Sequence, residues 1–160
     1  MVKLSLVISS QGGNIMGYRR LFIMRKDLNM SPGKLAAQVA HCAEAYWTNS
    51  IREWGALIYG KNPAYYEYSV YIEKDIFDQY INASFTKTIC GAKNKHQLLK
   101  AKTMAEEMGL MEGRDFGLIY DNCLTELTPE EENGTCLTGI WFAPLPDEIA
   151  HQISKKYQLL

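Results

Sequence analysis

The stretch that decides the fold is Asn29-Met30-Ser31-Pro32-Gly33-Lys34-Leu35-Ala36-Ala37-Gln38-Val39-Ala40-His41-Cys42-Ala43-Glu44-Ala45-Tyr46. Ser31 is a favourable N-cap, and Pro32 then takes the first helical position, where its missing N–H costs nothing. Residues that suit a buried face recur at helical spacing, namely Leu35, Val39, Cys42 and Tyr46. We therefore predict a helix that begins after Ser31 and packs this face on a core.

A second row of side chains on the same helix is polar. Lys34, Gln38 and His41 follow one another at spacings of four and three, about 100° around the helix from the apolar row. Taken alone, such a row is most simply a solvated face. A functional interpretation needs polar partners from elsewhere in the chain.

The rest of the chain predicts alternating strands and helices. The continuous apolar run of residues 20–25 is typical of a strand covered on both faces, and it leads directly into the first helix. Further strands are predicted at residues 85–90, 116–120 and 135–142, and further helices at 94–108 and 147–156. The last two strands should be antiparallel, because their connection is too short for a crossover helix. We predict an α/β protein, a three-layer α/β sandwich around a small four-stranded mixed sheet.

The domain organisation predicted is a leader at residues 1–17 and a single domain at 18–160 with an aromatic insert at about 47–83. Helical periodicity continues through 51–58, and a short helix is expected near 75–81. The insert carries four closely spaced tyrosines, Tyr65, Tyr66, Tyr68 and Tyr71. Partly buried packing is the simpler interpretation of this cluster, and a stacking surface for nucleic acid bases is the alternative.

Composition excludes several classes of protein. A chain of 160 residues can bury a sizeable core without metal or disulfide support. It holds four cysteines with no CxxC pair, so we expect free thiols in a reducing cytoplasm, with no metal and no cofactor. The longest apolar runs are of strand length, so we expect no membrane span.

Charge is uneven along a chain whose formal net charge is −1. Residues 84–104 hold five lysines and no acid, and residues 17–34 hold five basic residues and one acid. Residues 105–135 instead hold nine acids and one arginine. If the two basic segments meet in the fold, they form a basic face suited to a polyanion.

Two polar segments are predicted to share one edge of the sheet, because functional sites gather beyond the carboxyl ends of parallel strands. One is the start of the first helix, and the other is Asp121 to Thr125, directly after a strand. The sequence lacks the glycine spacing of a P-loop and the elbow of a nucleophilic serine. The chemistry that these residues still allow is hydrolysis by water, in which a carboxylate or amide orients the water and a cation stabilises the oxyanion. Asp121 could instead simply cap a turn.

The run from Gly33 to His41 after an apolar strand resembles the signature of the archaeal and eukaryotic type of peptidyl-tRNA hydrolase, the Pth2 family. Asp121-x-x-x-Thr125 resembles that family's Asp–Thr loop, and Gly134-Thr135 its turn before the last strand. The resemblance covers most of the chain, and it implies hydrolysis of the ester between a peptide and the 3′ end of tRNA. It also implies peptidyl-tRNA and a second copy of the chain as partners.

By position, the resemblance gives active-site roles to Lys34, Gln38, Asp121 and Thr125. We predict that Gly33, His41, Lys93 and Lys95 contact substrate, although a structural histidine bonded within the fold is the favoured interpretation of His41. The chain departs from the family pattern at residues 122–124 and in the long aromatic insert. The alternative function is therefore a non-catalytic Pth2-like binding module for RNA or a protein partner.

Overall fold

The structure is a computed structural model in which residues 17–58 and 64–160 are described, so the predicted leader lies almost wholly outside the described residues. The helices are α1 (Pro32–Asn49), α2 (Lys95–Glu107) and α3 (Asp147–Ser154), with π-helical segments η1 (Ser50–Trp54) and η2 (Ile76–Ser84). The strands are β1 (Tyr18–Arg25), β2 (Ala56–Ile58), β3 (Glu67–Ser69), β4 (Thr86–Ala92), β5 (Phe116–Asp121), β6 (Cys136–Phe142), β7 (Leu145–Pro146) and β8 (Gln158–Leu159).

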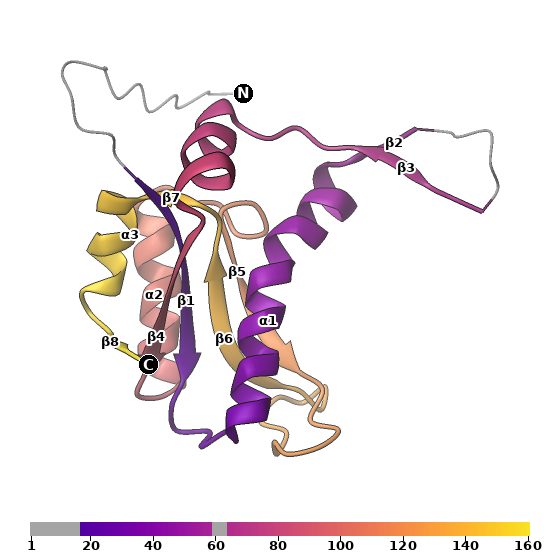
Figure 1. Ribbon diagram of the computed structural model, residues 1–160. Coiled ribbons are helices and arrows are strands. Elements are labelled where there is room, and N and C mark those ends of the chain that lie inside the picture. The colour runs from indigo at the N-terminus through magenta and orange to yellow at the C-terminus, as the bar shows by residue number, and fades with distance from the viewer. Residues whose placement is uncertain (1–16, 59–63) are drawn as a thin grey trace.

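The main sheet has the strand order β5-β6-β1-β4-β8, with β7 pairing β1 beside this path. β1 and β4 are parallel, whereas β6 is antiparallel to both β1 and β5. β1, β4 and β5 therefore run in one direction and end at the same edge of the sheet, the lower edge in Figure 1. The four predicted strands are adjacent in the sheet, but the predicted strand number is wrong, because the sheet has six strands. The two additional strands, β7 and β8, have two residues each and are too short to leave a pattern in the sequence.

Helices cover both faces of this sheet, which confirms the layered α/β architecture (Figure 1). On one face, α1 packs its predicted apolar row on Phe22, Met24 and Trp141. On the other face, α2 and α3 enclose the larger core cluster. The Ser31 hydroxyl accepts a hydrogen bond from the Lys34 N–H at 3.2 Å, so the predicted N-cap is confirmed.

The segment between α1 and β4 differs from the prediction. The helical periodicity over 51–58 predicts a helix, but the helix ends at Trp54, and residues 56–58 form β2 of a hairpin that projects away from the body (Figure 1). Tyr65, Tyr66 and Tyr71 are 71%, 83% and 91% exposed, so the interpretation as partly buried packing is wrong for these three; Tyr68 is 46% exposed. Because the hairpin projects away from the sheet and its helices, no layer of the described residues covers Tyr65, Tyr66 or Tyr71.

Two arginines of the predicted basic segment are buried rather than displayed. Arg20 lies inside the domain and donates to the carbonyl oxygens of Ala43, Cys42 and Phe142 at 2.5, 2.9 and 3.1 Å, and its burial lowers its pKa to about 10. Arg25 is also buried. The basic segments 17–34 and 84–104 do meet, through β1 and β4, but these two side chains are structural. No helix in the described residues has the length and apolarity needed to cross a membrane.

Candidate active site

The two polar segments predicted to share an edge meet at a carboxylate and a cation. Asp121 is the last residue of β5, just beyond a register irregularity between Ile119 and Tyr120, and Lys34 lies in the first turn of α1. The Lys34 Nζ atom is 2.7 Å from Asp121 Oδ2, and the side chains are only 14% and 10% exposed. Such an ion pair holds both groups in fixed positions at the rim of the fold.

Gln38 is buried at 1% exposure, so the solvated interpretation of the polar row is wrong for this residue. Its Nε2 donates to Asp121 Oδ2 at 2.7 Å, and its Oε1 accepts from the Thr138 hydroxyl at 2.7 Å. A carboxylate only accepts, so the amide nitrogen must face Asp121 and the amide oxygen must face Thr138. Sequence reasoning missed Thr138, because a threonine inside a strand is an ordinary β-former and gives no signal.

The Asp121 carboxylate is held ionised by its surroundings. Oδ1 accepts from the Cys123 N–H at 2.8 Å, while Oδ2 accepts from Gln38 beside the Lys34 ammonium. Burial acts to raise the pKa of Asp121, but these donors together hold it below its ordinary value. The bond to Cys123 is the turn cap that the structural interpretation expected, so Asp121 closes the turn with one oxygen and contacts the helix with the other.

Thr125 and Gly33 complete the predicted set at this edge. The Lys34 Nζ atom lies 3.3 Å from the Thr125 hydroxyl, to which it donates. Gly33 is exposed beside Lys34, with no atom within 4 Å of where a Cβ would stand. Sequence reasoning missed Glu126, whose carboxylate accepts from the Ser31 N–H and, at 2.6 Å, from the Ser31 hydroxyl. Its pKa is lowered by these bonds.

A groove of about 590 Å³ extends from this cluster along α1. It is lined by Lys34 and Asp121, continues past His41 to Arg52, and includes the buried Trp141. Its mixed polar and apolar lining also includes Leu118, Ile119, Tyr120, Asn122, Leu124 and Thr125. The groove gives a substrate access to the Lys34–Asp121 pair.

The structural interpretation of His41 is wrong. His41 is exposed on α1 and lines the groove, and its side chain makes no hydrogen bond or ion pair with another residue in the described ranges 17–58 and 64–160. It is therefore free to meet a ligand in the groove.

Lys93 directly follows β4 and Lys95 begins α2, and neither lines this groove. Lys95 is paired with Glu131, and Lys93 is exposed and lines a second pocket. The structure thus places Lys34, Asp121, Thr125 and His41 in the lining of one groove and joins Gln38 to Asp121 beside it. Gly33 is next to Lys34 in the chain but does not line the groove, and Lys93 and Lys95 lie elsewhere.

The cluster has the parts that hydrolysis by water requires. It offers an ionised carboxylate, an ammonium group and a hydroxyl beside an open groove. Among the described residues, no group of three or more His, Cys, Asp or Glu side chains is placed to hold a metal ion.

Comparison with known proteins decides the family. A model of the family described as "Peptidyl-tRNA hydrolase PTH2" matches residues 18–160. The chain belongs to the PTH2 family. The chain is 31% identical over 143 residues to the peptidyl-tRNA hydrolase of Thermococcus sibiricus, an alignment that covers 89% of this chain and 98% of that protein.

Further relatives match a similar share of the chain. The peptidyl-tRNA hydrolase of Thermoplasma acidophilum is 29% identical over 142 residues, covering 89% of this chain and 97% of that protein. That of Staphylothermus marinus is 29% identical over 148 residues, covering 89% and 95%. The PTH2 match begins with the first residue of β1 and includes the residues of the exposed hairpin.

Proposed function

We propose that this chain hydrolyses the ester that joins a peptide to the 3′ end of tRNA. Water supplies the nucleophile: its oxygen bonds to the ester carbonyl carbon, and the bond to the ribose 3′ oxygen breaks. One proton of the water ends on that ribose oxygen, so the products are a free peptide carboxyl group and a tRNA with a free 3′ hydroxyl. The observation that best supports this proposal is the Lys34–Asp121 ion pair, which lines the groove of a PTH2 domain.

Asp121 acts by orienting water rather than by being a strong base. Its lowered pKa makes it a weak proton acceptor near neutral pH, where an efficient general base has a pKa close to 7. Its oxygens already accept from Gln38 and Cys123, which fix the carboxylate against the helix. A fixed carboxylate can accept a hydrogen bond from water and hold it toward a carbonyl in the groove.

Lys34 supplies the positive charge for the oxyanion that forms as water adds to the ester. The ammonium is held by Asp121 and by the Thr125 hydroxyl, so it needs little reorganisation when charge develops. His41 then contacts the substrate from the groove wall, and Gly33 contacts it from the exposed first turn of α1 beside Lys34. The two residues Asn122 and Leu124, where the chain departs from the family pattern, line the same groove.

The test is hydrolysis of an N-acetylaminoacyl-tRNA, followed as release of free tRNA. Lys34→Ala is expected to reduce kcat by about 10²- to 10³-fold, the usual cost of removing one oxyanion donor. Lys100→Ala is the matched control, because Lys100 is an exposed lysine of α2 outside the groove. Circular dichroism checks that both variants are folded. If Lys34→Ala keeps the wild-type kcat, the assignment is wrong; saturable tRNA binding without turnover in the wild type supports the binding-module alternative.

We also propose that the protein acts in the cytoplasm and as a homodimer. All four cysteines are free, and Cys42, Cys90 and Cys136 are buried, as suits a reducing compartment. The homodimer rests on the family resemblance, and multi-angle light scattering of the purified protein tests it: a single species at the monomer mass, 18.2 kDa, would contradict it.

A further inference from the structure

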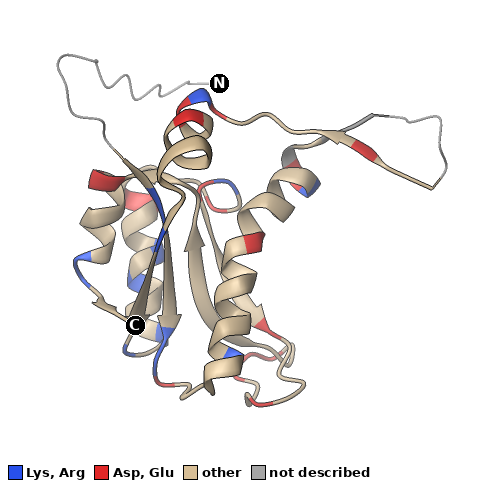
Figure 2. Ribbon diagram, in the orientation of Figure 1, with Lys and Arg blue, Asp and Glu red and all other residues tan. Residues whose placement is uncertain are grey.

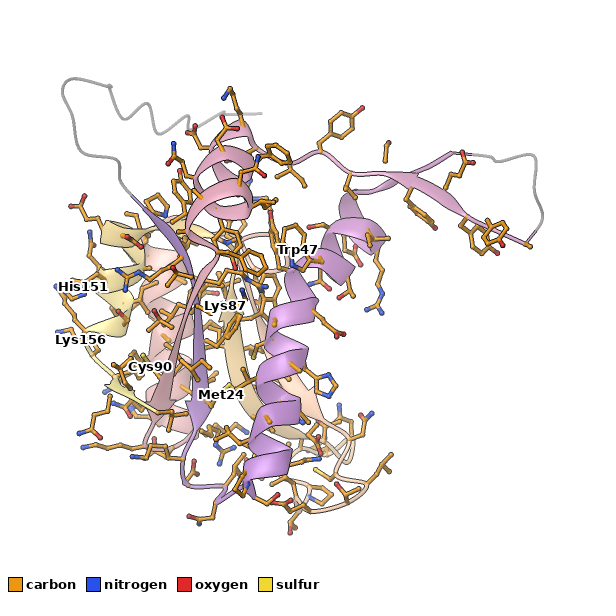
Figure 3. The ribbon with its side chains drawn as sticks, viewed as in Figure 1. Met24, Trp47, Lys87, Cys90, His151 and Lys156 are labelled. Carbon is orange, nitrogen blue, oxygen red and sulfur yellow. The ribbon has the colours of Figure 1, made fainter. Side chains whose placement is uncertain are left out.

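A second pocket, which we call the lysine pocket, lies across the sheet from the active site. It has a volume of about 270 Å³ and is lined by residues from the ends of β1 and β4, from α2 and from the chain after α3. Its lining is Lys26, Gly91, Lys93, Gln97, Lys155, Lys156, Tyr157 and Gln158. Four of these eight residues are lysines, and none is acidic. Figure 3 labels Lys156, on the opposite side of the molecule from α1.

These lysines differ from the others in the described residues. Lys34, Lys74, Lys95 and Lys102 are paired with carboxylates, and Lys87 lies over the rings of Phe85 and Tyr80. Five lysines in the described ranges have ammonium groups without such partners, and four of the five line this pocket; the fifth is Lys100. In a chain of net charge −1, an acid-free pocket with four unpaired ammonium groups is a strongly positive local feature.

The frame of the lysine pocket is fixed by backbone and buried contacts. A Cβ at Gly91 would lie 2.5 Å from the Lys26 Cδ atom, so the absence of a side chain there lets the Lys26 stem cross the sheet edge. The Tyr157 hydroxyl donates to the Gln97 carbonyl at 2.9 Å, and Gln97 Oε1 accepts from the Lys93 N–H at 2.5 Å. The three chain segments that carry the lysines are thus held together before any ligand arrives.

The pocket also lies beside the N-terminus of α2. Asn94 caps this helix, with its side chain accepting from the Gln97 N–H at 2.9 Å, and the first turn contains no acidic residue. The positive end of the helix dipole therefore adds to the field of the lysines without an internal carboxylate to offset it. Figure 2 shows basic positions at the lower ends of β1 and β4 and at the end of α3.

We propose that the lysine pocket binds backbone phosphates of the tRNA, a few nucleotides from the ester at its 3′ end. This inference rests on the proposed function. Lysine ammonium groups are point charges that suit phosphates without reading bases, as an enzyme acting on many tRNAs requires. The pocket supplies binding, and the Lys34–Asp121 pair supplies the chemistry.

The placement of the two sites fits one strand of nucleic acid. Asp121 ends β5 and Ala92 ends β4, and these strands are separated by β6 and β1 in the sheet order. Three strand spacings of about 4.8 Å separate the two strand ends by roughly 14 Å, and the groove and the pocket lie farther apart than this because they are on opposite faces of the sheet. At about 3.4 Å for each stacked nucleotide, the path between them takes more than about four nucleotides. A phosphate in the pocket would therefore belong to the same acceptor end whose ester reaches the groove.

The experiment compares the double variant Lys155→Ala/Lys156→Ala and the single variant Lys26→Gln with the control Lys100→Ala. With an N-acetylaminoacyl-tRNA, the double variant is expected to raise KM about tenfold and leave kcat unchanged. The dependence of log(kcat/KM) on log[salt] should become shallower by about 0.7 to 0.9 for each phosphate that the variant no longer binds. An N-acetylaminoacyl ester of adenosine has no phosphate, so the pocket variants should hydrolyse it at the wild-type rate.

Binding of uncharged tRNA, measured by fluorescence anisotropy at several salt concentrations, separates this proposal from the proposed function. Weaker binding and a shallower salt slope in the pocket variants support the lysine pocket even if the wild type hydrolyses no ester. Binding and KM equal to those of Lys100→Ala overturn the pocket while leaving the hydrolase standing. Retention of tRNA binding in the variants together with loss of inorganic phosphate binding would show a small-anion site, and would also overturn it.

Discussion

Thr138→Val should impair the active site without touching any residue that meets the substrate. Thr138 is fully buried, and its hydroxyl is the donor to the amide oxygen of Gln38 at 2.7 Å. Valine keeps the shape but removes the donor, which leaves a buried amide oxygen unsatisfied at a cost of about 1–3 kcal/mol in the free energy of unfolding. The amide is then no longer held against rotation away from Asp121.

The kinetic consequence follows from the hydrogen bond between Gln38 and Asp121. A hydrogen bond to a charged group contributes about 1.5–3 kcal/mol, so weakening it should reduce kcat by roughly tenfold. Gln38 is one of the donors that lower the pKa of Asp121, so its displacement raises that pKa toward the ordinary value. The acid limb of the pH profile of kcat should therefore move to higher pH.

The assay measures kcat for N-acetylaminoacyl-tRNA between about pH 2.5 and pH 8, a range that reaches below the ordinary pKa of an aspartate, together with urea unfolding at about pH 7. Thr138→Ser is the matched control, because it keeps the hydroxyl and removes only a methyl group. It should retain the wild-type kcat and acid limb while its free energy of unfolding falls by about 1 kcal/mol. A Thr138→Val protein that is folded, with wild-type kcat and an unmoved acid limb, would refute the positioning role.

Three further changes test the fold around this site. Arg20→Met should lower the free energy of unfolding by about 3 kcal/mol in urea titrations, since three carbonyl oxygens are left without a charged donor; a decrease below about 1 kcal/mol would contradict this. Gly33→Ala should raise it by about 0.4–1 kcal/mol, because the added methyl group meets no atom within 4 Å, and destabilisation would show that the position needs glycine. Glu130 has a pKa lowered by its bond to Arg25, so its stabilisation is present above the unfolded-state pKa and is lost as pH falls through the folded-state pKa. Glu130→Gln should thus flatten the decline of the urea midpoint between about pH 6 and pH 3, and an equal decline in both proteins would disprove the linkage.

Much of the fold could be predicted because local and long-range signals agree. The cap at Ser31, the apolar row of α1 and the continuous strand before it all indicate one arrangement, and the structure confirms each. The meeting of Lys34 and Asp121 could also be predicted, since it follows from parallel strands ending at one edge. These inferences depend on periodicity and topology, which a sequence carries directly.

The parts that could not be predicted depend on which side chains bury one another. Gln38 lies in the polar row of α1, but its side chain is buried, and its amide oxygen accepts a hydrogen bond from Thr138, a residue far along the chain. Arg20 is charged, yet carbonyl groups of α1 and of β6 surround it. Tyr65, Tyr66 and Tyr71 are of a residue type that often packs in a core, but no layer of the described residues covers them. None of these features leaves a periodic pattern or a residue spacing in the sequence from which it could be predicted.

The clasp between Glu126 and Ser31 changes what the first helix can offer to a phosphorylated ligand. The free N–H groups at the start of a helix attract anions, and here a carboxylate of the protein already occupies that position. A substrate phosphate would have to compete with a tethered anion of the same chain, whose effective concentration is high. A carboxylate of the protein is therefore already bound at the Ser31 end of α1, which leaves Lys34 to act on the ester rather than on the tRNA backbone.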